Sequence, residues 1–244
     1  MNGLIIGASA GVGRALAEAL AKQGWHLHLI ASDPQDLSAT TKDLGYRFGI
    51  SATYTVSDLT APDPAGLRAA VLTSFSCPDA IFFIAGAASD ADLDKESVSD
   101  AEVVRLINVN FGSAVRIINA FLPDLRVRAH ADIVAIGSVA AIRGRGRNMI
   151  YGSAKRGLEF YCEALRHLLA DTGCRVQFYR LGFVRTSMLE GRPPPLPSVR
   201  PETVAKAIIR NLGHDRSIYV PGWWALVAVV LTLIPWRIFK KLDI

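Results

Sequence analysis

Short aliphatic runs alternate with longer, helix-like patterns along most of the 244-residue chain. The runs predict strands at residues 3–6, 26–31, 51–56, 80–84, 132–137, 175–181 and 217–220. The patterns between them predict helices at 12–23, 34–44, 64–75, 101–125, 150–171 and 201–212. Because strands separated by helices form βαβ units, we expect an α/β fold, a doubly wound parallel sheet with helices on both faces.

Composition favours one packed domain. Half of the residues are hydrophobic and a fifth are charged, which excludes a disordered chain. We expect a domain over 1–220 that includes a proline-rich substrate loop at 187–200, followed by an apolar and basic tail at 221–244. Cys77, Cys162 and Cys174 lack C-x-x-C spacing, which excludes a disulfide framework or zinc knuckle and favours a reducing compartment.

A glycine-rich turn, G-A-S-A-G-V-G at residues 7–13, follows the first predicted strand and precedes the first helix. Glycines in this position let the backbone approach a pyrophosphate, which the helix N-terminus then stabilises. A plain glycine turn is the alternative. The strand before the turn and the helix after it favour a dinucleotide site.

A second constellation lies in the later half of the chain. Tyr151 and Lys155 are four residues apart in a predicted helix, so their side chains share one face. A nearby cation would lower the pKa of the tyrosine, which is otherwise a poor proton donor at neutral pH. Ser138 ends the strand that precedes this helix, at the sheet edge where open α/β folds bind ligands.

These motifs together resemble the short-chain dehydrogenase/reductase superfamily, whose fold is Rossmann-like, over nearly the whole chain. The resemblance implies that Tyr151 is the general acid/base, that Lys155 lowers its pKa and holds the nicotinamide ribose, and that Ser138 binds the substrate carbonyl. It further implies that Asn110 supports a proton-relay water and that Asp58 binds the adenine amino group. The cofactor-binding residues that it implies are Gly7, Ser9, Ala10, Gly11, Val12, Gly13, Ala31, Ser32, Asp58, Leu59, Ala85, Gly86, Ala87, Tyr151, Lys155, Leu181, Gly182, Val184 and Thr186.

Some positions depart from the family pattern. Ile6 replaces a usual threonine, Phe83 and Ile84 replace two asparagines, Leu181 replaces a proline, and Ser113 replaces a glycine. The four catalytic positions are retained, so we expect an active enzyme.

The end of the second predicted strand bears on cofactor choice. An acidic residue there would bind the ribose 2′-hydroxyl of NAD and repel a 2′-phosphate. The matching position is Ala31, followed by Ser32, which favours NADP(H) over NAD(H). Asp33, one position further on, argues mildly for NAD.

Other polar residues receive simpler interpretations. His26 and His28 share a strand face, but no third ligand is nearby, so we expect exposed strand residues and no metal site. The net charge of +5 comes from scattered residues, which argues against a nucleic-acid partner. The run R-G-R-G-R at 143–147 borders the expected active site and is interpreted as a solvated loop, or as a receptor for a phosphate or acidic substrate group.

The tail is apolar over residues 223–234, which is too short to span a bilayer as a helix, since a span needs about 20 residues. It could pack in a subunit interface. Alternatively, residues 223–241 could lie at a membrane surface, with Trp223, Trp224 and Trp236 at the headgroups and Arg237, Lys240 and Lys241 facing anionic lipid. The tail is also similar to that of the decaprenyl-phosphoribose 2-keto-reductase branch of the superfamily.

We therefore expect an NAD(P)(H)-dependent oxidoreductase that reduces a ketone on a lipid-linked or amphipathic substrate. One alternative is the same enzyme class acting on a soluble alcohol or ketone, with the tail as a dimer contact. Another is a non-catalytic NADP-binding regulatory protein. The chain opens without a secretory signal, so we expect a cytoplasmic homo-oligomer, a dimer or tetramer, with peripheral contact on the inner face of the membrane.

Overall fold

The computed structural model describes residues 1–189, 194 and 196–242. Within these residues, seven parallel strands form one sheet in the order β3-β2-β1-β4-β5-β6-β7. The strands are β1 (Asn2–Ile6), β2 (His26–Ala31), β3 (Ala52–Val56), β4 (Ala80–Phe83), β5 (Ala131–Ser138), β6 (Cys174–Leu181) and β7 (Arg216–Val220). The chain order reverses between β1 and β4, so the carboxyl ends of these strands border the crevice where doubly wound sheets bind ligands.

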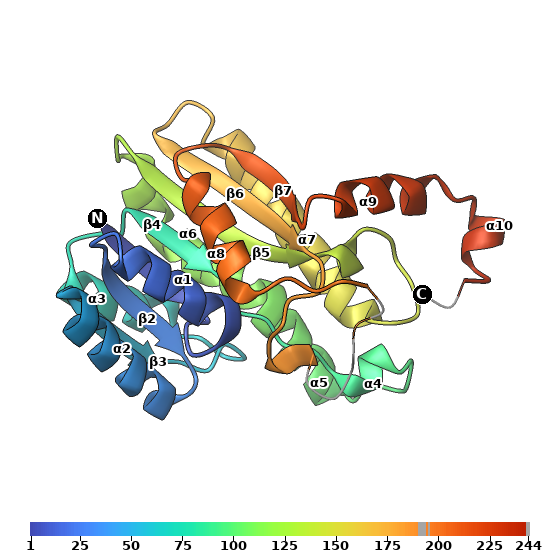
Figure 1. The fold of residues 1–244 in the computed structure, drawn as a ribbon, viewed down its shortest axis with the longest axis horizontal. Coiled ribbons are helices and arrows are strands. Elements are labelled where there is room, and N and C mark those ends of the chain that lie inside the picture. The colour runs from blue at the N-terminus through green and yellow to red at the C-terminus, as the bar shows by residue number, and fades with distance from the viewer. Residues whose placement is uncertain (190–193, 195, 243–244) are drawn as a thin grey trace.

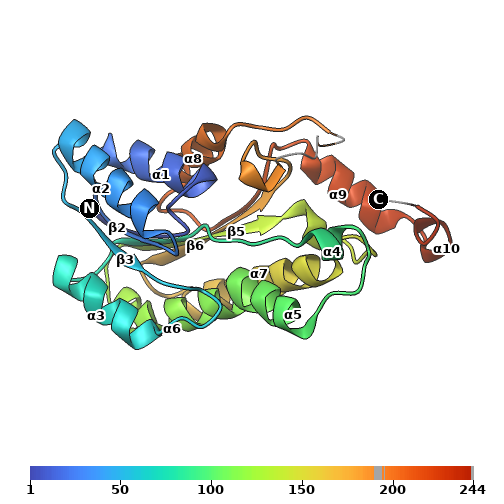
Figure 2. The ribbon, with the colours of Figure 1, turned by 90° about the horizontal axis from the view of Figure 1, so that it is seen from below.

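Helices cover both faces of the sheet (Figures 1 and 2). One layer holds α1 (Gly11–Ala21), α2 (Pro34–Phe48) and α8 (Pro201–Arg210). The other holds α3 (Pro64–Ser74), α5 (Asp100–Ile107), α6 (Ser113–Arg126) and α7 (Met149–Leu168). The short helix α4 (Asp90–Leu93) contacts α7. The predicted doubly wound α/β fold is confirmed.

Burial on both faces explains the continuous apolar strands. In β1, Leu4 and Ile6 point into the core beneath α6 and α7, whereas Ile5 points into the core beneath α1 and α2. All three side chains are fully buried. Successive side chains of a strand point to opposite faces, so a strand covered on both faces is apolar at most of its positions.

The helix expected over 101–125 is interrupted. A π-helical turn, Asn108–Gly112, separates α5 from α6, and it carries the buried side chain of Asn110. Such wider turns within helices often lie at functional sites. Here the turn lies at the carboxyl edge of the sheet, beside Ala87, which follows β4.

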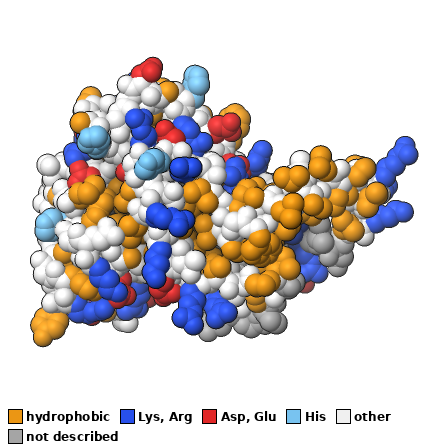
Figure 3. Space-filling model, turned by 45° about the horizontal axis from the view of Figure 1, so that its top comes forward, with side chains coloured by type: hydrophobic (Ala, Val, Ile, Leu, Met, Phe, Trp, Pro, Cys, Tyr) orange, Lys and Arg blue, Asp and Glu red, His pale blue; other side chains and the backbone are white. Residues whose placement is uncertain are grey.

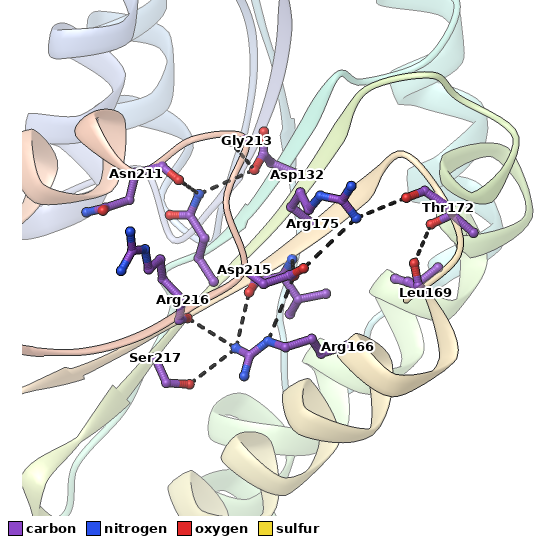
Figure 4. Close-up of polar contacts among 12 residues, drawn as sticks. Asp132, Arg166, Leu169, Thr172, Arg175, Asn211, Gly213, Asp215, Arg216 and Ser217 are labelled. Carbon is purple, nitrogen blue, oxygen red and sulfur yellow. Dashed lines mark hydrogen bonds and ion pairs between the residues drawn. The ribbon is translucent and has the colours of Figure 1, made fainter.

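The opposite, amino-terminal edge of β5, β6 and β7 is closed by a polar network (Figure 4). The Asp215 carboxylate accepts a hydrogen bond from the backbone nitrogen of Val176 at 2.7 Å. Arg166 donates to the carbonyl oxygens of Val176 and Arg216 at 3.2 and 3.1 Å. Asp132 accepts from Gly213 at 2.9 Å, and burial raises the pKa of its carboxyl. These contacts join the strand ends far from the glycine-rich turn, so they are structural.

The C-terminal segment projects beyond the domain (Figures 1 and 2). It contains α9 (Trp224–Leu233) and α10 (Trp236–Phe239), and Pro235 separates the two helices. We call residues 223–241 the arm. Figure 3 shows hydrophobic side chains along the arm and Lys and Arg side chains near its tip. In the described part of the chain, no helix combines the length and apolarity that crossing a membrane requires.

The interpretation of His28 as an exposed strand residue is wrong. Its side chain is 2 % exposed, and its ring nitrogens lie 2.8 to 3.0 Å from the hydroxyl oxygens of Thr53, Ser74 and Thr55. Burial lowers the pKa of His28 to about 4, because the charged ring would lose its hydration. Among the described residues, no group of three or more His, Cys, Asp or Glu side chains could hold a metal ion.

Candidate active site

The three glycines of the first turn occupy positions that a side chain could not. Gly7 has a φ of +90°, and a Cβ there would lie 2.6 Å from the backbone of Ala85. Gly11 has a φ of +53° and a Cβ there would lie 2.9 Å from Thr186. A Cβ on Gly13 would lie 1.9 Å from the carbonyl oxygen of Gly7. The turn is therefore packed between β4 and the segment after β6.

The geometry of this turn fits a pyrophosphate. Helix α1 begins at Gly11, and no side chain among the described residues caps its first turn. The first backbone N–H groups of a helix lack partners within it, and the helix dipole favours an anion there. Ser9, Ala10 and Val12 complete the turn, and only Val12 is buried.

The end of β2 presents no acidic side chain to this site. Ala31 is buried and Ser32 is exposed. The carboxylate of Asp33 accepts hydrogen bonds from the backbone nitrogens of Gln35 and Asp36 at 2.8 and 2.9 Å, so it caps α2. Both hydrogen bonds go to one carboxylate oxygen, Oδ1, so the helix cap fixes the orientation of Asp33, whose side chain remains exposed.

Asp58 and Leu59 follow β3 beside this strand end. The backbone nitrogen of Ser57 donates to the carbonyl oxygen of Ala31 at 2.9 Å, which holds the two segments together. The carboxylate of exposed Asp58 accepts from the backbone nitrogen of Thr60 at 2.8 Å, and this hydrogen bond lowers its pKa. Leu59 is buried in the core.

Lys155, Asn110 and Gly86 meet at the carboxyl end of β4. Lys155 is 2 % exposed, and its Nζ donates to the carbonyl oxygens of Ala85 and Ile136 at 3.2 and 3.1 Å. Asn110 Oδ1 accepts from the Ala87 nitrogen at 3.1 Å. A Cβ on Gly86 would lie 3.2 Å from Asn110 and 3.3 Å from Lys155 Nζ, so a small residue is needed there.

Tyr151 lies next to both Ser138 and Lys155. Burial raises the pKa of its phenol, and a hydrogen bond with the Ser138 side chain acts in the opposite direction. Lys155 Nζ lies 6.0 Å from the centre of the Tyr151 ring. Burial also lowers the pKa of Lys155 to about 7. The structure thus brings together the four predicted catalytic residues at the carboxyl edge of the sheet: Asn110, Ser138, Tyr151 and Lys155.

Asp92 is a site residue that the sequence reasoning missed. It lies in α4, is 3 % exposed, and accepts hydrogen bonds from the backbone nitrogens of Ile150 and Tyr151 at 3.0 and 2.9 Å. Its carbonyl oxygen accepts a further hydrogen bond from Asn148 at 2.9 Å. A carboxylate at a helix N-terminus stabilises the first turn, so Asp92 fixes the turn that carries Tyr151.

The segment after β6 passes over the glycine turn, as the contact between Thr186 and Gly11 shows. Leu181, the last residue of β6, and Val184, within this segment, are both buried. A Cβ on Gly182 would lie 2.0 Å from the indole nitrogen of Trp224, the first residue of α9. That indole nitrogen is buried and has no hydrogen-bond partner among the described residues. The arm therefore begins directly against the segment expected to close over the nicotinamide.

The other predicted features lie around this edge. Part of the substrate loop predicted at 187–200 lies outside the described residues. In the run R-G-R-G-R, Arg143 is engaged with the arm: it donates to the carbonyl oxygens of Leu231 and Ile234 at 2.6 and 2.5 Å. Arg145 is half-buried, and burial lowers the pKa of its guanidinium. Cys162 is a buried core thiol, as expected.

Comparison with known proteins agrees with this geometry. Residues 2–195 match the family model described as short chain dehydrogenase. An uncharacterized oxidoreductase of Mycobacterium tuberculosis is 33% identical over 155 residues, 62% of this chain and 61% of that protein, so the chain matches less than two thirds of its length. The 3-oxoacyl-acyl-carrier-protein reductase FabG of Escherichia coli is 30% identical over 188 residues, 76% of this chain and 74% of FabG.

A solved structure extends the match to the whole chain. A short-chain dehydrogenase from Sphingobium yanoikuyae, solved in complex with NADPH, superposes with a TM-score of 0.79. It is 24% identical, and the match covers 99% of this chain and 98% of that protein. The fold is therefore shared over the entire length. The family match over residues 2–195 and the similarity to FabG show that the chain belongs to the short-chain dehydrogenase family.

Proposed function

We propose that this protein is an NADPH-dependent reductase that converts a ketone on an amphipathic or lipid-linked substrate to an alcohol. The observation that carries the reaction type is the arrangement of Tyr151, Ser138 and Lys155 at one sheet edge. Ser138 and Tyr151 can both direct a hydroxyl toward a substrate carbonyl oxygen. A bound nicotinamide cofactor would supply the hydride.

Tyr151 is the proton donor in this proposal. The phenol is protonated at neutral pH, and its hydrogen bond with Ser138, which acts against the pKa-raising effect of burial, favours release of that proton. When the phenol gives its proton to the carbonyl oxygen, the protonated form of Lys155, whose Nζ lies 6.0 Å from the ring centre, would stabilise the resulting phenolate. The side-chain amide of Asn110 accepts a hydrogen bond from the backbone nitrogen of Ala87 and donates one to its carbonyl oxygen. These two bonds hold the loop after β4 beside Lys155.

NADPH is proposed over NADH from the end of β2. Ala31 offers no carboxylate, and the Asp33 carboxylate caps α2. The exposed hydroxyl of Ser32 is free to donate to a 2′-phosphate, since none of the described hydrogen bonds involves it. A fixed acid would repel that phosphate, so its absence supports NADPH.

The position and apolar surface of the arm support the proposal of an amphipathic substrate. It is attached to the segments on either side of the site, through Trp224 against Gly182 and through Arg143. An apolar helix beside the mouth of the site offers a surface to a hydrocarbon chain. The competing proposal is a soluble ketone or alcohol as substrate, with the same apolar side chains covered by a second copy.

The test is NADPH oxidation measured against panels of keto-lipids, keto-sugars and small ketones. Tyr151→Phe removes the proton donor and keeps the ring, so turnover should fall by about 10²–10⁴-fold while NADPH affinity stays nearly unchanged. More than about a tenth of wild-type turnover in this variant would contradict the role of Tyr151. NADPH binding without turnover of any ketone would favour the third possibility, a non-catalytic NADP-binding regulatory protein.

A further inference from the structure

The exposed side of α9 is a continuous apolar stripe. Leu226, Val229, Val230 and Leu233 recur at helical spacing, and their exposed fractions lie between 53 % and 75 %. The opposite side of the helix is buried at Trp224 and Ala228, so the helix packs on the domain along that side. The sequence of α9 contains no charged residue. The stripe is thus a fixed surface of the folded protein.

The two ends of the stripe carry aromatic and cationic side chains. Trp223 precedes α9 and Trp236 follows it, with exposed fractions of 39 % and 63 %. Arg237, Lys240 and Lys241 lie beyond Trp236, and all three are exposed. Residues 216–242 contain no Asp or Glu, and Asp243 follows them in the sequence. Tryptophan at the ends of an apolar segment with cations beyond it is the pattern of a membrane–water interface.

Two contacts fasten the arm to the rim of the candidate active site. Trp224 packs on Gly182, as described above, and its ring centre lies 6.1 Å from that of Phe183. On the other side, Arg143 bonds the last carbonyl oxygens of α9, and its guanidinium carbon lies 4.0 Å from the centre of the Phe239 ring. Arg143 lies on the connection from Ser138 to Tyr151. The position of the arm is therefore coupled to both segments.

We propose that the arm docks this protein on an anionic lipid surface, with the stripe facing the acyl chains and the three cations facing the headgroups. Docking holds the mouth of the site at the lipid surface. The docking proposal rests on the proposed function in one respect: docking would bring the site to an amphipathic substrate at the lipid surface. A second copy could also cover the stripe, but a contact between two apolar stripes would not use Arg237, Lys240 and Lys241, which lie beyond Trp236.

Vesicle cosedimentation tests the proposal on the full chain. We expect binding to phosphatidylcholine vesicles that increases with phosphatidylglycerol content and decreases with added salt. The combined stripe variant Leu226→Gln, Val230→Gln and Leu233→Gln should lower the partition coefficient at least about 100-fold, because three exposed side chains lose their transfer into lipid. All three side chains are exposed, so the fold should remain intact.

The cation variant combines Arg237→Gln, Lys240→Gln and Lys241→Gln. Each cation removed should lower binding about fivefold, or on the order of 100-fold together. Its matched control, Lys42→Gln with Arg126→Gln and Lys206→Gln, removes the same charge from exposed positions elsewhere. The control for the stripe replaces exposed Tyr46 and Val127 with Gln. Both controls should bind vesicles as the wild type does.

The outcomes separate docking from catalysis. Absent vesicle binding, binding indifferent to phosphatidylglycerol and salt, or a stripe variant that loses only its oligomeric state would overturn the docking proposal. NADPH oxidation with a small ketone is measured on the same preparations. Turnover without vesicle binding would overturn docking and leave the reductase standing. Vesicle binding without turnover of any ketone would overturn the reductase proposal and leave the docking proposal standing.

Discussion

Three consecutive residues, Ala31, Ser32 and Asp33, show how neighbouring positions can differ in what they offer a ligand. Ala31 ends β2 and is buried, whereas Ser32 is exposed. The Asp33 carboxylate is held by two backbone nitrogens of α2. An acid two positions beyond the strand end can thus belong to a helix cap. Of the three residues, Ser32 is the exposed one whose side chain makes none of the described hydrogen bonds.

Replacing Ala31 with Asp should shift the cofactor preference toward NADH. The new carboxylate would repel a 2′-phosphate and accept a hydrogen bond from a 2′-hydroxyl. We expect the ratio of kcat/KM for NADPH to that for NADH to fall by about tenfold or more, since about 1.4 kcal/mol of discrimination is a factor of ten. The control Ser32→Ala should weaken binding of NADPH and leave binding of NADH unchanged. A wild type that already prefers NADH would contradict our assignment of this strand end.

His28 should make the stability of the protein depend on pH. Its folded pKa of about 4 lies below the unfolded value near 6.5, so only the unfolded chain binds a proton between these values. Stability is therefore complete above pH 6.5 and is lost as the pH falls toward 4, by roughly 3 kcal/mol in all. Urea unfolding across this range measures the effect.

The matched variants are His28→Asn and His26→Asn on the same strand. The first should flatten the dependence of unfolding free energy on pH between 6.5 and 4, because the titrating ring is gone. The second replaces a ring on an exposed residue and leaves His28 in place, so the wild-type slope should remain. Equal slopes in the wild type and His28→Asn would show that another group causes the acid sensitivity.

At the scale of elements, α7 depends on the four-residue helix α4 for its start. The side chain of Asn148, which precedes α7, does not cap the helix. Instead, the Asp92 carboxylate accepts hydrogen bonds from two backbone nitrogens of the first turn. That turn carries Tyr151. A small, separate element therefore positions the proton donor, although it contributes no group to the reaction.

Asp92→Ala should lower both stability and turnover. Two buried N–H groups would lose their acceptor, which should cost about 1–3 kcal/mol in unfolding free energy. We expect kcat to fall by about 10- to 100-fold, because a small displacement of a reacting group is costly, with KM for NADPH little changed. Asp92→Asn keeps an acceptor oxygen, so its kcat and its unfolding free energy should lie between those of the wild type and of Asp92→Ala. A kcat unchanged in Asp92→Ala would remove its positioning role.

The elements differ in how far the sequence could predict them. Ser138, Tyr151 and Lys155 were predictable because each lies in a local pattern of strand or helix. Asp92 was not, because it caps a helix whose first residue lies far along the chain. The burial of His28 depends on hydroxyls from Thr53, Thr55 and Ser74, which the fold alone brings together.

The same distinction holds for the arm. Its apolar and cationic composition was visible in the sequence. Its attachment to the site was not, because the contacts of Arg143 with Leu231 and Ile234, and of Trp224 with Gly182, join segments that have no shared pattern. Long-range packing of this kind is decided by the tertiary fold, which a single sequence does not reveal.

At the scale of the whole molecule, two exposed apolar surfaces need separate explanations. One is the stripe on the arm. The other is represented by exposed apolar side chains on the neighbouring helices α5 and α7, where Val104, Ile107 and Phe160 are 48 %, 42 % and 73 % exposed. These two helices pack against each other, so the three side chains belong to one layer of the domain. We propose that the stripe contacts lipid and that the protein forms a homo-oligomer through the exposed side chains of α5 and α7, two helices that pack on the core.

The oligomeric state tests this division. Phe160→Glu places a charge at the centre of the exposed side of α7, and burying an unpaired carboxylate in an interface is costly, so the oligomer should dissociate by at least one step in light scattering after gel filtration. The variant should still bind anionic vesicles, because the arm is unchanged. The stripe variant should behave in the opposite way, keeping the oligomer and losing the vesicles. If Phe160→Glu leaves the oligomer intact and the stripe variant dissociates it, the arm is the contact between copies, and the argument for a lipid surface at the site no longer holds.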